Sequence, residues 1–272
     1  MALWVNGSLV DAEAPALRAD DHGITVGDGI FETMKVVDGT PFALTRHLRR
    51  LKASADGLAI ALDLDEVRAA IGEVLRVDGS ATARLRVTVT AGPAPFGTDR
   101  GDATPTLMVA TAALTGWPET ADVTVVPWQR NEWSATAGLK TISYADNVVA
   151  LRYARERGAD EAIFANTSGQ ICEGTGTNIF VGVGGRLLTP PTTSGCLPGI
   201  TRELLIEWLG DVAEESMPIE GLPHCDEAFL TSSTRNVQPI RHVDGWALNT
   251  CPGPLTERAA SVFAERSQDL DP

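Results

Sequence analysis

The sequence lacks the features that mark secreted and membrane-spanning proteins. It has only four cysteines, and no two of them form the C-x-x-C pair of metal or redox sites. The first residues, MALWVNGSLVDAEAP, contain no basic region followed by an apolar core, and no stretch approaches the roughly 20 apolar residues of a membrane-spanning helix. We therefore expect neither a signal peptide nor a membrane span, and we predict a protein of the reducing cytoplasm.

Positive charge is also scarce. The chain carries 22 Lys and Arg residues against 36 Asp and Glu residues, which gives a net charge of −14 at pH 7. Such an acidic surface repels nucleic-acid phosphates and anionic lipids, so we expect no partner of either kind. A small anionic substrate remains compatible with this charge, because a few arginines reverse the field inside a pocket. The four histidines show no zinc spacing with the cysteines, so we expect no metal.

Several catalytic motifs are missing as well. The sequence has no G-x-x-x-x-G-K-[ST] loop, no G-x-G-x-x-G after a strand, no G-x-S-x-G and no H-E-x-x-H. These absences argue against nucleotide-binding enzymes, serine esterases and zinc peptidases.

Hydrophobic patterning indicates a mixture of strands and helices. Residues 29–37 and 84–90 have the composition or the alternation of strands. Over residues 44–58, leucine and alanine recur at spacings of three and four, which predicts an amphipathic helix. A further helix is predicted over residues 200–209. This mixture predicts an α/β (α+β) fold.

The chain is long enough for two domains of ordinary size. Residues 114–120, LTGWPET, have the composition of a linker. We predict an N-terminal α/β domain over residues 1–115, an interdomain linker over residues 116–122 and a C-terminal domain over residues 123–272.

Two polar side chains stand out among small and apolar neighbours. Lys140 follows Gly138 and Leu139, and a desolvated lysine acts as a nucleophile or a base. The alternative interpretation is an ordinary surface lysine at a strand end. Glu173 precedes the small-residue turn at residues 174–177. A buried carboxylate there needs a partner such as a protonated ring nitrogen, and an exposed turn residue is the alternative.

Three further features suit a phosphate group. Residues 197–201, LPGIT, precede a predicted helix whose free N–H groups would bind an anion. Residues 231–234 offer several hydroxyls, and Arg50 lies at the edge of the buried stripe of its helix. Helix capping, a polar turn and a solvated helix face are the respective alternatives. Together with the lysine and the glutamate, these groups are what pyridoxal 5′-phosphate (PLP) requires.

On these residues the chain resembles the class IV aminotransferases, the fold type IV PLP enzymes. That family includes branched-chain aminotransferases, D-amino-acid aminotransferases and 4-amino-4-deoxychorismate lyases. Residues 27–33 (GDGIFET) are similar to its G-D-G-x-F-E segment, and residues 47–51 (HLRRL) match H-x-x-R-L. Residues 172–180 (CEGTGTNIF) resemble E-G-x-x-x-N-[IL]-F, and residues 197–202 (LPGITR) resemble L-x-G-[IV]-T-R. The motifs keep the family's order over nearly the whole chain.

The resemblance implies a two-domain fold of the D-amino-acid aminotransferase type, with PLP in the cleft between the domains. It also implies a homodimer, whose partner chain helps to build the substrate pocket. In this resemblance Lys140 is catalytic and forms the Schiff base with PLP, Arg50 grips the phosphate, and Glu173 meets the pyridine nitrogen. The other cofactor-binding residues that it implies are Tyr144, near the PLP ring hydroxyl, Gly199, Ile200 and Thr201 in the phosphate turn, and Ser233.

The resemblance leaves two reactions open. Thr33 stands where lyases usually have Thr and branched-chain enzymes have Gly, and its hydroxyl would assist proton transfer; a strand-favouring residue is the alternative. Phe31 and Arg86 are expected to contact substrate, with a surface strand charge as the alternative for Arg86. Residues 92–98 lack the R-x-H pair that D-amino-acid aminotransferases use for the substrate carboxylate. Ala91 stands where lyases usually have an Arg, and this difference weakens the prediction of a lyase.

We predict a 4-amino-4-deoxychorismate lyase that gives 4-aminobenzoate and pyruvate for folate synthesis. The alternative is a class IV aminotransferase acting on D-amino acids, branched-chain amino acids or (R)-amines. Joint retention of Lys140, Glu173 and Arg50 argues against a homologue that has lost catalysis. The missing loops argue against a sugar or nucleotide enzyme.

Overall fold

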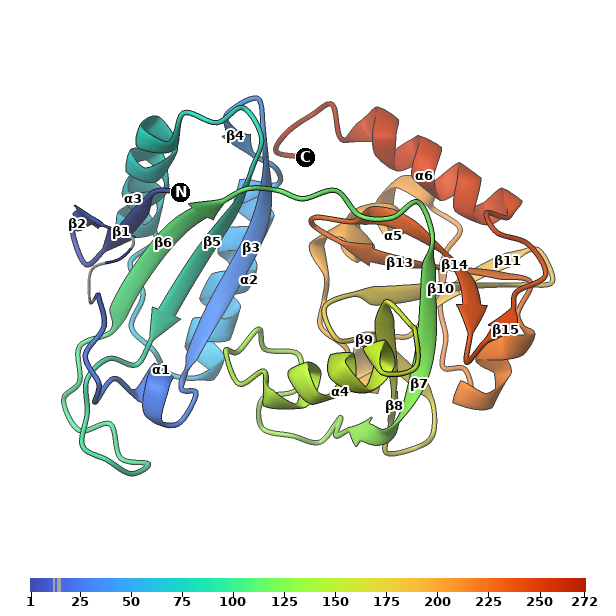
Figure 1. The fold of residues 1–272 in the computed structure, drawn as a ribbon, viewed down its shortest axis with the longest axis horizontal. Helices are drawn as coiled ribbons and strands as arrows, with labels where there is room; N and C mark the ends of the chain where they lie inside the picture. The colour runs from blue at the N-terminus through green and yellow to red at the C-terminus, as the bar shows by residue number, and fades with distance from the viewer. Residues whose placement is uncertain (12, 14–15) are drawn as a thin grey trace. The chain divides into compact units, whose positions relative to one another are not determined.

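The computed structural model describes residues 1–11, 13 and 16–272. Contacts divide the chain into two compact units, each with its own sheet (Figure 1). The first unit comprises residues 1–115, 139–144 and 269–272, and the second comprises residues 116–138 and 145–268.

This division differs from the predicted domains in two respects. The predicted C-terminal domain included the lysine segment, whereas the contacts of residues 139–144 assign Lys140 to the first unit. The predicted linker ended at residue 122, whereas the first long strand of the second unit already begins at Ala121. Both differences arise because contacts between segments distant in sequence leave no mark on local composition.

The first unit is built on an antiparallel sheet with strand order β2-β1-β6-β5-β3-β4 in the described residues. Helices α2 and α3 cover one face of this sheet (Figure 1). The elements of the unit are β1 (Leu3–Val5), β2 (Ser8–Val10), α1 (His22–Thr25), β3 (Gly29–Val37), β4 (Thr40–Pro41), α2 (Leu44–Gly57), α3 (Leu64–Asp78), β5 (Ala83–Thr90) and β6 (Thr106–Ala112).

The alternation of β3 decides which side chains meet the helices. Ile30, Met34 and Val36 are fully buried in the core with apolar residues of α2 and α3. Because successive side chains of a strand point to opposite faces, Phe31 and Thr33 lie on the face that these helices leave uncovered. The sequence pattern thus separates a packing face from a face available to the site.

Helix α3 has clear signals at both ends. The side chain of Asp63 accepts hydrogen bonds from the N–H groups of Asp65 and Glu66 at 2.9 and 3.4 Å, which caps the helix N-terminus. Gly79 ends the helix with a φ of +63°, a conformation that favours glycine. The apolar residues between them pack on β1 and β6 and fix the helix on the sheet.

The second unit is built on a larger mixed sheet. Its strand order is β12-β11-β10-β13-β14-β7-β8-β9, and β15 pairs with β14. Strand β7 runs parallel to both β8 and β14. The strands are β7 (Ala121–Arg130), β8 (Glu161–Asn166), β9 (Ile171–Gly174), β10 (Asn178–Val183), β11 (Arg186–Thr189), β12 (Ala213–Glu214), β13 (Glu227–Ser232), β14 (Asn236–Val243) and β15 (Trp246–Ala247).

The helices of the second unit pack on this sheet (Figure 1). Helix α4 contacts β7 and β8 through Ala150 and Ala154, which are fully buried. Helices α5 and α6 pack on each other, with Trp208 against Phe263, and on β13 and β14. The helices are α4 (Ala145–Arg155), α5 (Ile200–Leu209) and α6 (Pro254–Arg266), with 3-10 turns η1 (Thr192–Ser194) and η2 (Ile219–His224).

Candidate active site

The lysine segment lies along the start of β3 in the first unit. The carbonyl oxygen of Lys140 accepts a hydrogen bond from the Phe31 N–H at 3.0 Å, and the Ile142 N–H donates to the Gly29 carbonyl at 2.9 Å. The Lys140 N–H donates to the buried Ser54 hydroxyl on α2 at 3.0 Å. The backbone of Lys140 is therefore fixed by a strand and by a helix at once.

The ring of Phe31 is the centre of a side-chain cluster on the uncovered face of the sheet. The Lys140 ammonium nitrogen lies 4.3 Å from the ring centroid, and the Arg86 guanidinium carbon lies 3.9 Å from it. The ring of Tyr144 packs edge-on against Phe31, with 5.1 Å between centroids. Three of the predicted site residues thus meet around the ring of a fourth, and the two basic ones lie in the distance range of cation–π contacts.

Strand register places Thr33 beside this cluster. Thr33 lies directly opposite Arg86 in the β3–β5 pair, so both side chains lie on the same face. The Arg86 Nε donates a hydrogen bond to the Thr88 hydroxyl at 3.1 Å, two residues along the same strand. These contacts orient the guanidinium over Phe31.

Arg50 is held by a carboxylate that the sequence analysis gave no role. Its Nε and Nη2 donate to the two oxygens of Glu32 at 2.7 Å each, and Glu32 Oε2 also lies 2.6 Å from His47 Nδ1. All three side chains are buried, and Glu32 and His47 are fully so. The fork of hydrogen bonds fixes the direction of the Arg50 guanidinium.

The ionisation of this buried group follows from its contacts. Burial opposes the charged form of Glu32, but the neighbouring charges of Arg50 and His47 and their hydrogen bonds hold its pKa well below the ordinary value. Burial also lowers the pKa of His47, although Glu32 acts in the opposite direction. Because the ionised Glu32 carboxylate only accepts hydrogen bonds, His47 Nδ1 carries the proton in this contact.

Glu173 is the anchored carboxylate of the second unit. Its Oε1 accepts a hydrogen bond from Arg130 Nε at 3.2 Å, and its Oε2 accepts the Leu197 N–H at 2.9 Å. Arg130 Nη2 in turn donates to the Asn147 side-chain oxygen at 2.9 Å, and its guanidinium lies 4.2 Å from the Phe164 ring centroid. The carboxylate is therefore oriented by both a charged side chain and the backbone.

A buried network continues from this carboxylate. Asn147 donates to the carbonyl of Thr175, and Glu161 Oε1 accepts the Thr175 N–H at 3.1 Å. Glu161 Oε2 pairs with Arg235 Nη2 at 2.7 Å, and both side chains are almost completely buried. These contacts fix the turn that follows Glu173.

The predicted phosphate turn adopts the expected place before a helix. Gly199 is the N-cap of α5, and no side chain caps it in the described structure. A Cβ on Gly199 would lie 1.9 Å from the Asn178 side-chain oxygen, so the turn or Asn178 would have to shift. Asn178 also donates to the Leu197 carbonyl at 2.8 Å and lies opposite Thr231 in the β10–β13 pair. The Thr231 hydroxyl is buried without a hydrogen-bond partner among the described residues.

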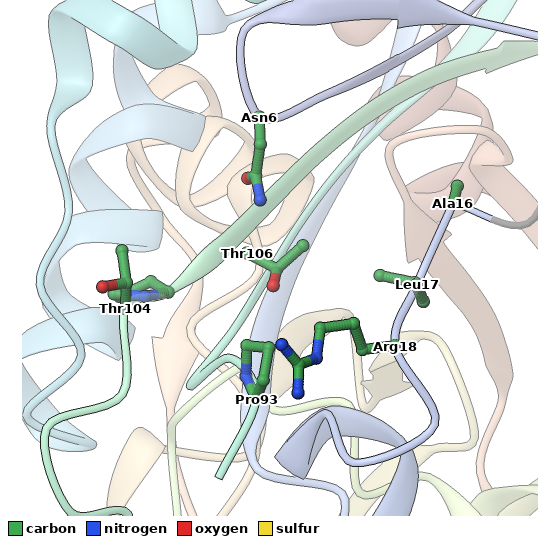
Figure 2. A pocket seen from close by; sticks show the side chains of 8 residues that line it. Asn6, Ala16, Leu17, Arg18, Pro93, Thr104 and Thr106 are labelled. Carbon is green, nitrogen blue, oxygen red and sulfur yellow. The ribbon is translucent and has the colours of Figure 1, made fainter.

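The first unit also contains a pocket that is separate from the predicted site residues. It has a volume of about 250 Å³, and Arg18, which contributes to its wall, pairs with Asp20 at 2.7 Å (Figure 2). None of the predicted site residues lines it. Its lining consists of Asn6, Ala16, Leu17, Arg18, Pro93, Thr104, Pro105 and Thr106.

Two global features are also visible in the described part of the chain. No group of three or more histidine, cysteine, aspartate or glutamate side chains there is arranged to hold a metal ion. Within the same residues, no helix has both the length and the apolar character needed to cross a membrane.

Comparison with known proteins identifies relatives over almost the whole length. The family model for amino-transferase class IV matches residues 29–243. The branched-chain-amino-acid aminotransferase of Salmonella typhimurium is 29% identical, covering 96% of this chain and 91% of the relative. The aminodeoxychorismate lyase of Bacillus subtilis is 28% identical, covering 98% of this chain and 95% of the relative. The crystal structure of Escherichia coli branched-chain amino acid aminotransferase superposes with a TM-score of 0.91 at 28% identity, over 97% of this chain and 93% of that one.

The fold and these matches define a fold type IV PLP-dependent enzyme. More narrowly, the chain belongs to the class IV aminotransferase family. PLP is the cofactor of this family. Asn178 lies opposite Thr231 in the β10–β13 pair and beside Gly199 at the N-terminus of α5. The buried Thr231 hydroxyl, which has no hydrogen-bond partner among the described residues, fits a phosphate group, because a phosphate needs hydrogen-bond donors.

The structure gathers the predicted residues into two sets. The first unit brings together Phe31, Thr33, Arg86, Lys140 and Tyr144, and it holds Arg50 at the Glu32 carboxylate. The second unit joins Glu173 to the turn of Gly199, Ile200 and Thr201 through the Leu197 N–H, and Ser233 follows the end of β13.

Sequence reasoning missed the residues that hold these side chains in place. Glu32 lies inside the motif segment 27–33 and His47 inside the segment 47–51. These motifs could have indicated both residues, although neither was assigned a role. Arg130 and Asn147 lie in no motif, and their link to Glu173 depends on segments distant in sequence.

Proposed function

We propose that the protein is a PLP-dependent aminotransferase acting on amino acids. The observation that carries this proposal is the cluster on Phe31, where the Lys140 amine and the Arg86 guanidinium lie 4.3 and 3.9 Å from the ring centroid. An amine that attaches the cofactor and a cation that holds a substrate carboxylate are the two groups that the reaction needs side by side. Names of relatives support an aminotransferase, because branched-chain aminotransferases predominate among them.

In this proposal the first unit supplies the reacting side chain. Lys140 would attach the cofactor covalently, and its Nζ would carry the proton that leaves the substrate α-carbon. Its backbone bonds to Phe31 and Ser54 fix the main chain of the lysine, and its Nζ lies 4.3 Å from the centroid of the Phe31 ring. Tyr144 would orient the cofactor ring through its hydroxyl, and Arg50, fixed by Glu32, would contact the phosphate.

Residues from β9, α5 and the segment after β13 would hold the ring nitrogen and the phosphate of the cofactor. Bound PLP acts as an electron sink for the substrate carbanion. Glu173, already accepting hydrogen bonds from Arg130 and Leu197, would accept one from the pyridine nitrogen. The N–H groups of Ile200 and Thr201 and the hydroxyl of Ser233 would bind the phosphate.

The 4-amino-4-deoxychorismate lyase remains a second candidate on one observation. Thr33 lies opposite Arg86 in the strand register, so its hydroxyl adjoins the proposed substrate carboxylate site. The Bacillus subtilis relative named as an aminodeoxychorismate lyase supports this alternative. A lyase would release pyruvate and 4-aminobenzoate without needing an amino acceptor, and it would belong to folate synthesis.

We further propose that the enzyme is a cytoplasmic homodimer. The cysteines of the described residues are free thiols, as expected in a reducing compartment. Three of these thiols are buried, those of Cys172, Cys196 and Cys225. Light scattering of the purified protein would test the dimer.

One set of measurements separates the candidates. The PLP-loaded protein is mixed with single amino donors, and the loss of its visible absorption band is followed with no keto acid present. An aminotransferase converts one equivalent of donor and stops, whereas a lyase releases pyruvate from 4-amino-4-deoxychorismate over many turnovers. The aminotransferase proposal fails if no L- or D-amino acid or (R)-amine changes the band while pyruvate release continues.

A further inference from the structure

Two turns of the second unit lie at the same edge of its sheet. Strand β7 is parallel to both β8 and β14, so these three strands begin at one edge. Strand β9 is antiparallel to β8, and its end therefore returns Glu173 to that edge. Strand β13 is antiparallel to β14, which places the connection of residues 233–235 there as well. Glu173 and Ser233, proposed to contact the ring nitrogen and the phosphate of PLP, are thus carried on one edge of a single sheet.

A buried ion pair joins these two turns. Arg235 Nη2 donates to Glu161 Oε2 at 2.7 Å, and neither side chain is more than 5% exposed. Glu161 Oε1 accepts the Thr175 N–H at 3.1 Å and the Thr175 hydroxyl as well. Arg235 is two residues after Ser233, and Thr175 is two residues after Glu173. The pair therefore ties the backbone beyond Glu173 to the connection that contains Ser233.

The link reaches the Glu173 carboxylate through further hydrogen bonds. The Thr175 carbonyl accepts a hydrogen bond from the Asn147 side-chain nitrogen. The Asn147 side-chain oxygen accepts one from Arg130 Nη2 at 2.9 Å, and Arg130 Nε donates to Glu173 at 3.2 Å. A continuous path of contacts thus runs from Arg235 to the carboxylate proposed to meet the ring nitrogen.

The Arg235 guanidinium is fixed on its other sides as well. Its Nη1 donates to the Gln238 side-chain oxygen at 2.8 Å, and its central carbon lies 3.8 Å from the centroid of the Trp117 ring. Gln238 in turn donates to the Pro118 carbonyl at 2.8 Å, just before β7 begins. An ammonium group cannot make all of these contacts at once, because they need the planar fork of a guanidinium.

Stability alone does not account for a buried pair of this kind. Burial lowers the pKa of the Arg235 guanidinium, whereas the negative charges of Glu161 and Asp160 act to raise it. The desolvation of two charges offsets much of their attraction, so a buried ion pair contributes little net stability. Its charged hydrogen bonds are directional, however, and they fix the groups that they join.

We propose that Arg235 is a positioning residue, which holds the turn of Glu173 and the connection of Ser233 in the mutual arrangement that PLP needs. This inference rests on the proposed function, because only there do Glu173 and Ser233 contact the cofactor. In this role Arg235 acts through Glu161 rather than by touching PLP. Its removal should therefore affect binding at both the ring nitrogen and the phosphate.

The test measures PLP affinity by equilibrium dialysis in three variants. Arg235→Met removes the charge, Arg235→Lys keeps the charge without the fork, and Glu161→Gln keeps an acceptor for the Thr175 N–H. We expect Arg235→Met to bind PLP roughly ten- to a hundredfold more weakly than the wild type, because charged hydrogen bonds are lost. Arg235→Lys and Glu161→Gln should weaken binding less. Arg258→Met, which breaks an exposed ion pair of the same 2.7 Å length with Asp211, should bind PLP as the wild type does.

Two further readouts separate positioning from general destabilisation. Competition by inorganic phosphate in the same dialysis reports the turn of Ser233. The pH at which the visible band of bound PLP changes reports the charge at the ring nitrogen, and hence the position of Glu173. In Arg235→Met we expect phosphate to bind at least about threefold more weakly and the pH midpoint to move by about half a unit or more. A loss of thermal stability alone would change neither value.

The inference is overturned if Arg235→Met binds PLP as tightly as Arg258→Met does, or if its PLP affinity falls while phosphate binding and the pH midpoint keep their wild-type values. Should Arg235→Met fail to fold, the same measurements on Arg235→Lys and Glu161→Gln decide the question. Failure of the aminotransferase proposal looks different, because then PLP binds but no amino donor changes the visible band. The dialysis still decides the role of Arg235 in that case.

Discussion

The carbonyl oxygen of Lys140 accepts a hydrogen bond from the N–H of Phe31 at 3.0 Å, which joins residues 109 positions apart. The same aromatic ring lies beneath the Lys140 amine. The lysine proposed to react is thus fixed by the first unit's sheet, although the chain reaches it only after entering the second unit. Its backbone position is set by the hydrogen bonds to the Phe31 N–H and to the Ser54 hydroxyl.

Removal of the Ser54 hydroxyl should loosen the lysine segment. Ser54 is buried and accepts the Lys140 N–H at 3.0 Å, so Ser54→Ala leaves that donor without its partner. We expect a loss of about 1–3 kcal/mol in the free energy of unfolding and slower cofactor attachment. Urea denaturation and the rate at which the visible band forms measure the two effects. Ser8→Ala, at an exposed position, is the control; equal values for both variants would contradict the prediction.

Glu32→Gln should be among the most destabilising substitutions in the first unit. It removes the charge that Arg50 and His47 share in a fully buried position. Breaking a buried ion pair by removing one partner costs about 3–5 kcal/mol, because the remaining charge is left uncompensated. Denaturant titration against Glu119→Gln, an exposed glutamate, would measure this cost. A difference below about 1 kcal/mol would show that Glu32 does not stabilise Arg50.

The same carboxylate predicts an acid-dependent loss of stability. Its pKa in the folded protein lies well below the value of 4.5 expected when unfolded. Between these values the unfolded state binds more protons, so the stabilisation is complete above about pH 4.5 and is lost as the pH falls toward the folded pKa. The free energy of unfolding should fall more steeply below pH 4.5 in the wild type than in Glu32→Gln. Parallel curves would rule out this role.

Lys35 predicts a dependence of the same sign at alkaline pH, because here too the stability rises with pH. Burial lowers its pKa from 10.5 to about 8, so between these values the unfolded state binds more protons. The contribution of Lys35 to stability therefore rises as the pH increases from about 8 to 10.5. Thermal unfolding across this range should show an increment in the wild type that Lys35→Met lacks. Lys52→Met, at a partly exposed lysine paired with Asp56, should retain the increment.

Gly199→Ala should impair cofactor binding through the phosphate turn. The new Cβ would lie 1.9 Å from the Asn178 side-chain oxygen, so the turn or Asn178 must move. Such overpacking costs about 1–3 kcal/mol, and we expect PLP affinity to fall roughly ten- to a hundredfold. Equilibrium dialysis of PLP measures the effect. Gly116→Ala, where a Cβ meets nothing within 4 Å, should bind PLP as the wild type does.

Local sequence patterns predicted the elements with strong periodicity. The strand over residues 29–37 and the helix over residues 200–209 have the predicted bounds in the structure. The predicted helix over residues 44–58 ends one residue earlier, at Gly57. In these segments apolar and strand-favouring residues recur at strand or helix spacing, so composition and spacing were enough.

Other features depend on contacts that a single sequence does not display. Strand β7 begins inside the predicted linker because its pairing with β8 and β14, rather than its own composition, defines it. The assignment of Lys140 to the first unit depends on bonds to Phe31 and Ser54. Arg50 was recognised as an anion-binding side chain, whereas its buried partner Glu32 became visible only in the structure.

The most direct test of the account is a single-turnover reaction of the PLP-loaded protein with one amino donor, in the wild type and in Lys140→Ala. We expect the wild type to lose its visible band and to form one equivalent of keto acid. Lys140→Ala should lack the covalent attachment and form no keto acid. If Lys140→Ala converted the donor at the wild-type rate, Lys140 would not be the reacting residue and the proposed function would be contradicted.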